Sequence, residues 1–70
     1  MPERRIATLE RLVVHGPGKD SWFIRPGSRS RPWTWFKSWE VPEVDARAAV
    51  FELERIRGGW RVLRLVEIKS

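Results

Sequence analysis

Short runs of β-branched and aromatic residues alternate with polar residues along most of the chain, and turn residues separate the runs. The stretch Arg5–Val14 leads into His15–Asp20, which is rich in Gly and Pro, and Ser21–Ile24 follows. A strand, a Gly/Pro turn and an aromatic strand predict a β-hairpin. The apolar residues over 3–14 also have helical spacing, so a helix remains the alternative for this stretch.

The middle of the chain predicts a loop and a third strand. Two prolines, a glycine and two serines make Pro26–Pro32 a loop, because proline cannot donate to a strand ladder. Trp33–Trp39 then reads as a strand, with alternate residues on opposite faces. One face carries Trp33, Trp35, Lys37 and Trp39, and the other carries Thr34, Phe36 and Ser38. We expect the face with Lys37 to be exposed; the reverse assignment stays open, since alternation alone cannot decide it.

The last third predicts a second hairpin. Ala48–Arg57 and Trp60–Lys69 are both rich in β-formers and flank a Gly-Gly turn. A helix over 45–57 is the alternative, because Asp45 could cap one, but it would leave the final strand without a partner. A helical turn is expected near Pro42–Arg47.

Together these elements predict an all-β fold, a small five-stranded barrel forming a single domain over residues 1–70. Closing the sheet would remove exposed edges. Five residues are expected in the core: Ile24, Phe51, Leu53, Trp60 and Val62.

Composition narrows the chemistry. Among 70 residues there is no cysteine and one histidine, His15, in a turn. Disulfides and thiolate metal sites are therefore excluded, and we expect no metal, no cofactor and no catalytic triad, hence no enzyme. We find no signal peptide and no apolar run long enough to span a membrane, so we expect a cytoplasmic protein. The absence of Asn and Gln predicts a thermophilic source.

Charge is unevenly distributed. Residues 19–37 carry five basic residues and one acid, residues 38–54 carry five acids and one base, and residues 55–70 carry five bases and one acid. Two basic blocks on either side of an acidic one predict a face with a positive field.

Several segments resemble the cold-shock domain, a small version of the OB-fold barrel. The family's Lys-Gly-Phe-Gly-Phe-Ile strand is similar to Lys19–Ile24, and its Asp-Val-Phe-Val-His strand to Trp33–Lys37. Its later Val-x-Phe-Glu-Val strand, Gly-rich turn and final strand are similar to Ala49–Leu53, Arg57–Gly59 and Trp60–Val66. The resemblance implies an OB-like barrel in which Phe23, Trp35 and Lys37 contact nucleic acid; an SH3-like barrel stays the alternative fold.

The residues themselves also favour nucleic-acid binding. Single-strand binders combine a basic groove with aromatic side chains on which bases stack. A candidate surface combines aromatic and basic residues from the middle of the chain: Lys19, Trp22, Phe23, Arg25, Arg29, Arg31, Trp33, Trp35, Lys37 and Trp39. We expect single-stranded DNA or RNA as the partner, a monomer or homodimer, and no membrane. The alternatives are a chromatin-type duplex-DNA binder and a protein-interaction module, such as a phage-encoded or accessory inhibitor, because interfaces also favour Trp and Arg.

Overall fold

The computed structural model describes residues 2–13, 20–29, 31 and 33–69. It contains five strands and one 3-10 helix, and its strands confirm the expected all-β class. Each of the two stretches for which a helix was the alternative contains a strand and no helix among its described residues. The elements are β1 (Arg4–Leu12), β2 (Ser21–Ile24), β3 (Thr34–Lys37), η1 (Ser38–Glu40), β4 (Ala48–Ile56) and β5 (Gly59–Lys69). No helix in the described part of the chain is long and apolar enough to cross a membrane.

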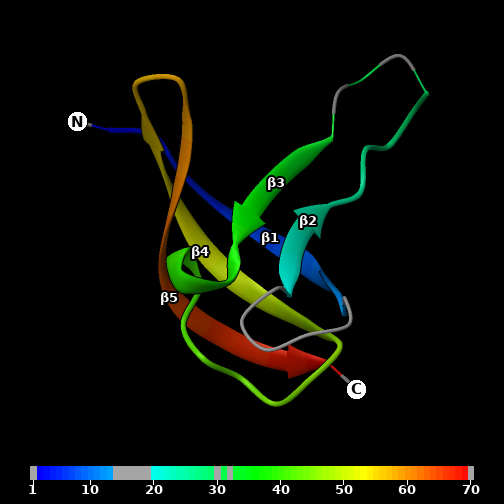
Figure 1. Ribbon diagram of the computed structural model, residues 1–70. Coiled ribbons are helices and arrows are strands. Elements are labelled where there is room, and N and C mark those ends of the chain that lie inside the picture. Colours follow the sequence, from blue (N-terminus) through cyan, green and yellow to red (C-terminus); the bar gives the residue numbers. More distant parts are fainter. Residues whose placement is uncertain (1, 14–19, 30, 32, 70) are drawn as a thin grey trace.

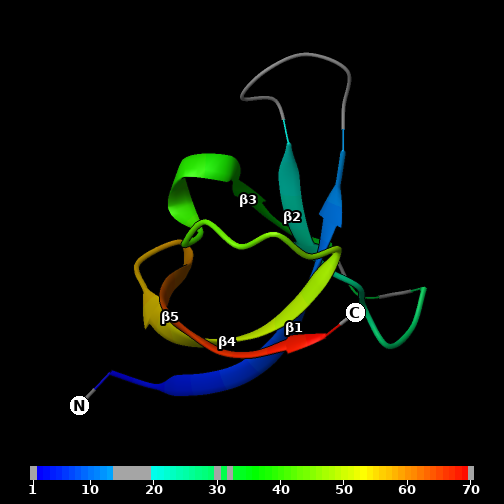
Figure 2. The ribbon, with the colours of Figure 1, turned by 90° about the horizontal axis from the view of Figure 1, so that it is seen from below.

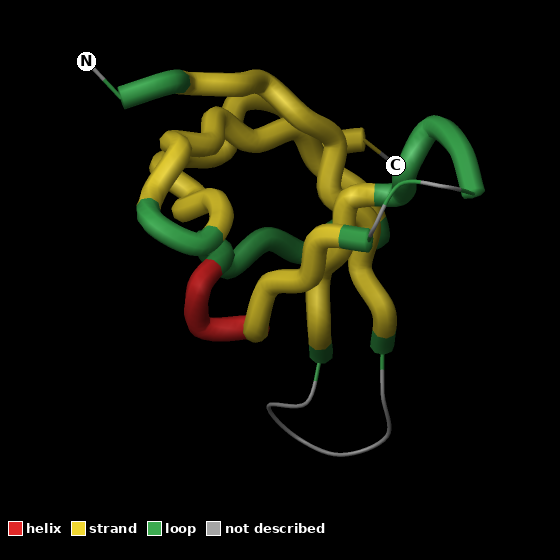
Figure 3. Tube along the Cα trace, turned by 90° about the horizontal axis from the view of Figure 1, so that it is seen from above, coloured by secondary structure: helices red, strands yellow, loops and turns green. Residues whose placement is uncertain are grey.

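The five strands form one antiparallel sheet in the order β3-β2-β1-β4-β5, so β1 is its central strand (Figure 1). Register shifts between Val50 and Phe51 and between Glu52 and Leu53 interrupt the β4–β5 ladder. Such irregularities bend a strand and increase its twist. Seen end-on, the sheet curls around a central core (Figure 3).

The expected closure of the barrel is not observed. β3 and β5 are the two edges of the sheet, and no ladder joins them in the part of the chain that the structure describes. β3 has only four residues, and the chain leaves it through η1. η1 lies between the end of β3 and β5, so it occupies part of the space that a closing ladder would need (Figures 1 and 2).

The helical turn comes earlier than the sequence indicated. It was expected near Pro42–Arg47, but the turn is η1, and the predicted strand over Trp33–Trp39 ends at Lys37. The carboxylate of Glu40 accepts a hydrogen bond of 2.7 Å from the backbone N–H of Lys37, which stabilises the turn at this point. The segment between η1 and β4 then passes across one open end of the curled sheet (Figure 2).

The core lies on the inner face of the curl. Leu9, Phe51 and Leu53 are fully buried, which confirms the expectation for the last two. The rings of Trp22 and Phe51 meet edge to face, with centroids 5.7 Å apart and an interplanar angle of 80°. Ile24, Trp60 and Val62 were also expected in the core; they pack against it but remain partly exposed. A tryptophan and two phenylalanines thus supply much of the buried area that so short a chain needs.

Candidate nucleic-acid interface

Strand pairing decides which aromatic residues of β2 and β3 face outward. Trp22 is paired with Phe36, and Phe23 with Trp35. The first pair points into the core, where Trp22 is 4% exposed and Phe36 is 3% exposed. Trp22 was predicted on the binding surface; that placement is corrected, because its ring is packed inside. The expectation that Phe36 is buried behind an exposed Trp face is confirmed.

Three rings gather on the outer face of β2 and β3, and we call Phe23, Trp33 and Trp35 the outer aromatic cluster. The Phe23 ring centroid lies 5.3 Å from that of Trp33 and 5.2 Å from that of Trp35. The two indoles are 6.1 Å apart and stacked at 21°. Trp33 is 46% exposed and Trp35 is 53% exposed, whereas Phe23 is 8% exposed. Phe23 was also predicted to contact nucleic acid, and that placement is corrected, because its ring is buried beneath the indoles. Phe23 therefore supports the indoles, and only the tryptophans offer ring faces to a ligand.

Arg25 borders this cluster and holds it in place. Its guanidinium carbon lies 5.6 Å from the ring centroids of both Phe23 and Trp33. The guanidinium also donates to both carboxylate oxygens of Glu10, at 3.0 and 3.3 Å. The hydrogen bond and the charge of Glu10 raise the pKa of Arg25, against a small opposing effect of desolvation. Arg25 is thus always charged, but Glu10 neutralises much of its field.

The other predicted basic residues near the cluster are free of carboxylates within the described ranges. Arg29, Arg31 and Lys37 are exposed, and none of them takes part in an ion pair among the described residues. Arg29 lines a small hollow together with Arg25 and Trp33, beside the outer aromatic cluster. Lys19, also predicted in the site, lies outside the described residues. Arg29 and Lys37 are consequently charges that border the cluster and are available to an anion, and Arg31 is a further exposed charge on the loop before β3.

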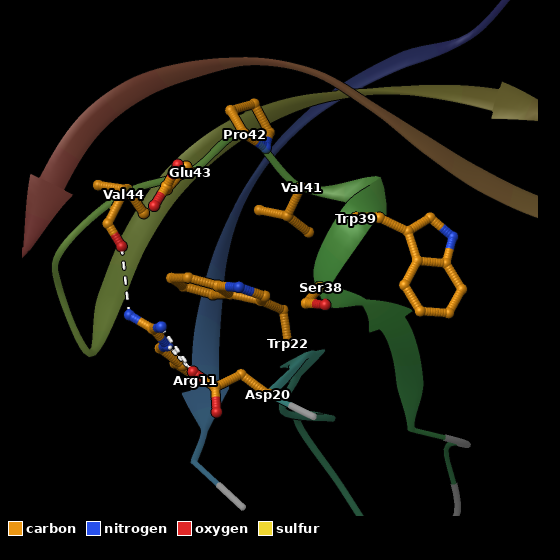
Figure 4. A pocket seen from close by; sticks show the side chains of 9 residues that line it. All are labelled: Arg11, Asp20, Trp22, Ser38, Trp39, Val41, Pro42, Glu43 and Val44. Carbon is orange, nitrogen blue, oxygen red and sulfur yellow. Dashed lines mark hydrogen bonds and ion pairs between the residues drawn. The ribbon is translucent and has the colours of Figure 1, made fainter. Parts of the chain in front are cut away.

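Trp39 is exposed but is not part of the cluster. It is 77% exposed and lies on η1, beyond the end of β3, so strand alternation no longer applies to it. Its neighbour is the ammonium of Lys37, 5.9 Å from its ring, and no ring contact joins it to the cluster among the residues described. Trp39 instead borders a pocket of about 400 Å³ beside Trp22 (Figure 4).

This pocket holds a structural ion pair rather than a free binding group. Arg11 Nε donates to the Asp20 carboxylate at 2.9 Å, and another guanidinium nitrogen donates to the Val44 carbonyl at 3.3 Å. The same guanidinium lies 5.8 Å from the Trp22 ring centroid. Figure 4 shows these partners around Arg11. Its charge is therefore used to tie β1 to the segment that crosses the end of the core. No group of three His, Cys, Asp or Glu side chains that could hold a metal ion is found within the described ranges.

A second hollow lies along the open edge of β3, and we call it the seam groove. It has a volume of about 520 Å³, with Trp35 and Phe36 on one side and Arg55, Arg57 and Trp60 on the other. The turn between β4 and β5 forms its rim, where Gly58 has a φ of +85° that other residues rarely adopt. Sequence reasoning placed no binding residue on the side of this turn. The adjacent basic residues and Gly-Gly turn were visible in the sequence, but their proximity to β3 depends on the curl of the sheet.

Comparisons with known proteins identify no relative. No family model matches the sequence, and neither a curated protein nor a solved structure matches the chain.

Proposed function

We propose that this chain binds single-stranded nucleic acid, DNA or RNA, on the outer face of β2 and β3. Bases stack on the exposed faces of Trp33 and Trp35, and Arg29, Arg31 and Lys37 contact phosphates. Stacking of a base on an aromatic side chain contributes about 1–3 kcal/mol per base and tolerates any sequence.

The observation that carries this proposal is the half-exposed state of two stacked indoles over a buried phenylalanine. Single exposed apolar side chains are common on protein surfaces and need no explanation. Two exposed indoles that stack on each other and rest on a third ring form a contiguous apolar patch, and such patches mark binding sites. The rings are held by Phe23 and Arg25, so little conformational freedom is lost when a base stacks on them.

The position of the cluster also supports the proposal. Five-stranded, partly open OB barrels bind oligonucleotides on the face of strands 2 and 3, and the outer aromatic cluster occupies β2, β3 and the residue just before β3. A duplex is the weaker candidate, because its base faces are inaccessible to a stacking surface. A cytoplasmic location belongs to the same proposal, in keeping with a chain without cysteine.

The test is a titration of tryptophan fluorescence with oligo-dT and with a duplex of equal length, at two salt concentrations. We expect strong quenching by oligo-dT that weakens as salt rises, because stacking and phosphate contacts act together. Trp35→Ala should weaken binding by about fivefold or more. Trp39→Ala is the matched control: it also removes an exposed indole, but outside the cluster, and should leave affinity nearly unchanged.

Equal losses in the two variants would show that any exposed tryptophan serves, and would contradict the proposed site. No response to either ligand at low salt would overturn nucleic-acid binding altogether. The exposed Trp and Arg surface would then be assigned to a protein partner. Thermal melting of each variant separates a loss of binding from a loss of fold.

A further inference from the structure

Two arginines share one indole at the end of the sheet opposite the Arg11 ion pair. The guanidinium carbon of Arg5 lies 5.8 Å from the Trp60 ring centroid, and that of Arg55 lies 5.3 Å from it. Arg5 is on β1 and Arg55 is on β4, and the β1–β4 register places Arg5 opposite Leu53. Trp60 is opposite Arg55 on β5. Three adjacent strands thus bring two positive charges to a single ring.

Neither guanidinium is neutralised by a carboxylate that the structure describes. Arg5 and Arg55 are exposed and form no ion pair within the described part of the chain. The nearest acid along β4, Glu54, pairs with Arg61 and Arg4 on the opposite face of the sheet. Glu3 contacts Arg55 through its backbone carbonyl, which accepts the Arg55 N–H at 2.7 Å. The site is therefore cationic and has a rigid aromatic platform.

The seam groove connects this cationic end to the outer aromatic cluster. Arg55 and Trp60 line one side of the groove, and Trp33 and Trp35 line the other. Among the residues described, its one acidic lining residue is Glu40, whose carboxylate accepts the Lys37 backbone N–H. A ligand that stacks on Trp35 and continues across the edge of β3 toward Arg55 therefore passes two arginines, Arg55 and Arg57, and one carboxylate, which is held by the backbone of Lys37.

We infer that Arg5, Arg55 and Trp60 form a phosphate-binding site at the end of the seam groove, which receives a backbone phosphate of the strand stacked on Trp33 and Trp35. A guanidinium can donate two parallel N–H groups to phosphate oxygens, and the cation–π contacts with Trp60 bring both guanidiniums to the same ring. The path of the bound strand rests on the proposed function. The phosphate site itself lies apart from the outer aromatic cluster, so it can be tested without a nucleic-acid strand. The bound strand runs across the edge of β3, rather than along it.

The first test compares two double variants that remove the same charge. Arg5→Ala/Arg55→Ala removes the proposed site, and Arg61→Ala/Arg64→Ala removes two arginines that are paired with Glu54 and Glu52 on the opposite face. Affinity for a ten-residue oligo-dT is measured over a range of salt concentrations. We expect the first variant to bind about tenfold more weakly at low salt. The slope of the logarithm of the affinity against the logarithm of the salt concentration should become less steep by about 0.7 for each phosphate that the variant no longer neutralises. The second should bind at most about twofold more weakly at low salt, because the charges that it removes act only through a screened, long-range field, and it should keep the slope of the wild type.

Equal behaviour of the two double variants would overturn the phosphate site, while a retained requirement for Trp35 would leave the proposed function standing. Arg5→Lys/Arg55→Lys should recover part of the affinity, because lysine keeps the charge but not the fork geometry.

A second readout does not depend on a nucleic-acid strand. Inorganic pyrophosphate is titrated into the protein while the indole N–H signals of the five tryptophans are followed by NMR. We expect a saturable shift of the Trp60 signal that is lost in Arg5→Ala/Arg55→Ala and kept in the control variant, showing that the free anion also occupies the site. If oligo-dT does not bind at all, this shift alone still supports the anion site. Its absence together with unchanged oligo-dT affinity in the double variant would contradict the inference.

Discussion

The outer face of β2 and β3 and the outer face of β1, β4 and β5 use the same residue types in opposite ways. On the second face every arginine lies beside a carboxylate: Arg61 bonds to Glu54, and Arg64 bonds to Glu52 at 2.9 Å. On the first face Arg25 is paired with Glu10, but Arg29 and Arg31 of the loop before β3 form no ion pair among the described residues. Arg61 and Arg64 each have a carboxylate directly opposite them across the β4–β5 ladder, whereas Arg29 and Arg31 lie on a loop and have no ladder neighbour in the described part of the sheet.

The comparison also shows why net charge is a poor guide to a binding surface. The C-terminal block of the chain, residues 55–70, is as basic as residues 19–37. Much of its charge is cancelled by the acidic block that pairs with it across the β4–β5 ladder. Among the basic residues of 55–70, Arg55, Arg57 and Lys69 form no ion pair in the described part of the chain. Arg55 and Arg57 lie at the turn, next to the seam groove, and Lys69 ends β5.

The largest expected effect is the removal of both exposed indoles. Trp33→Ala/Trp35→Ala should reduce affinity for oligo-dT by about thirtyfold or more, since each stacked base contributes about 1–3 kcal/mol. Fluorescence anisotropy of a labelled oligonucleotide measures this without relying on the deleted tryptophans. A reduction of less than about threefold would mean that the two faces do not differ in function.

A smaller effect is expected when the support beneath the indoles is changed. Phe23→Leu keeps an apolar side chain in place but removes the aromatic pairing with Trp33 and Trp35. We expect the free energy of unfolding, measured by urea denaturation, to fall by about 1 kcal/mol, because aromatic pairs contribute about 0.5–1.5 kcal/mol beyond their buried area. An unchanged stability would show that the rings do not depend on one another.

The smallest effect is expected when the arginines on the outer face of β1, β4 and β5 lose their carboxylate partners, as Arg29 and Arg31 already lack them among the residues described on the other face. Glu52→Gln/Glu54→Gln frees Arg61 and Arg64 from their carboxylates. Exposed ion pairs contribute about 0–1 kcal/mol each, so the melting temperature should fall only slightly. Affinity for oligo-dT should rise by about twofold at low salt and not at all at high salt, since charge without stacking adds only a screened attraction. A stronger gain would show that unpaired charge alone makes a binding face.

Local patterns predicted the strands, because each strand carries its own alternation and turn signals. The β4–β5 hairpin follows from this level. Alternation also placed Trp33 and Trp35 on one face, but it left open whether that face is exposed, and the structure shows that it is. The same rule would also have separated Trp22 from Phe23, since neighbouring residues of a strand face opposite sides. Both were assigned to the surface because aromatic content was counted without alternation.

Features that depend on distant parts of the chain were not predictable in this way. The failure of the sheet to close depends on where β3 ends, and that is decided by the Glu40 carboxylate and η1. The meeting of Arg5 with Trp60 requires the β1–β4 register and the curl of the sheet, and no local spacing reports either. Trp39 was misplaced for a related reason, because alternation was extended past the last strand residue.

The central position of β1 has a consequence for how the molecule folds. β1–β2, β2–β3 and β4–β5 are pairs of neighbours in the sequence, whereas the β1–β4 ladder joins residues as far apart as Arg4 and Glu54. Hairpins form within microseconds, but closing a loop of this length is slow, and an isolated hairpin is only marginally stable. During folding the segment β1–β3 therefore exists before β4 pairs with β1, with its indoles exposed and its edges unpaired. Refolding at high protein concentration is the condition under which this chain is most prone to aggregate, and the segment responsible contains the surface proposed to bind nucleic acid.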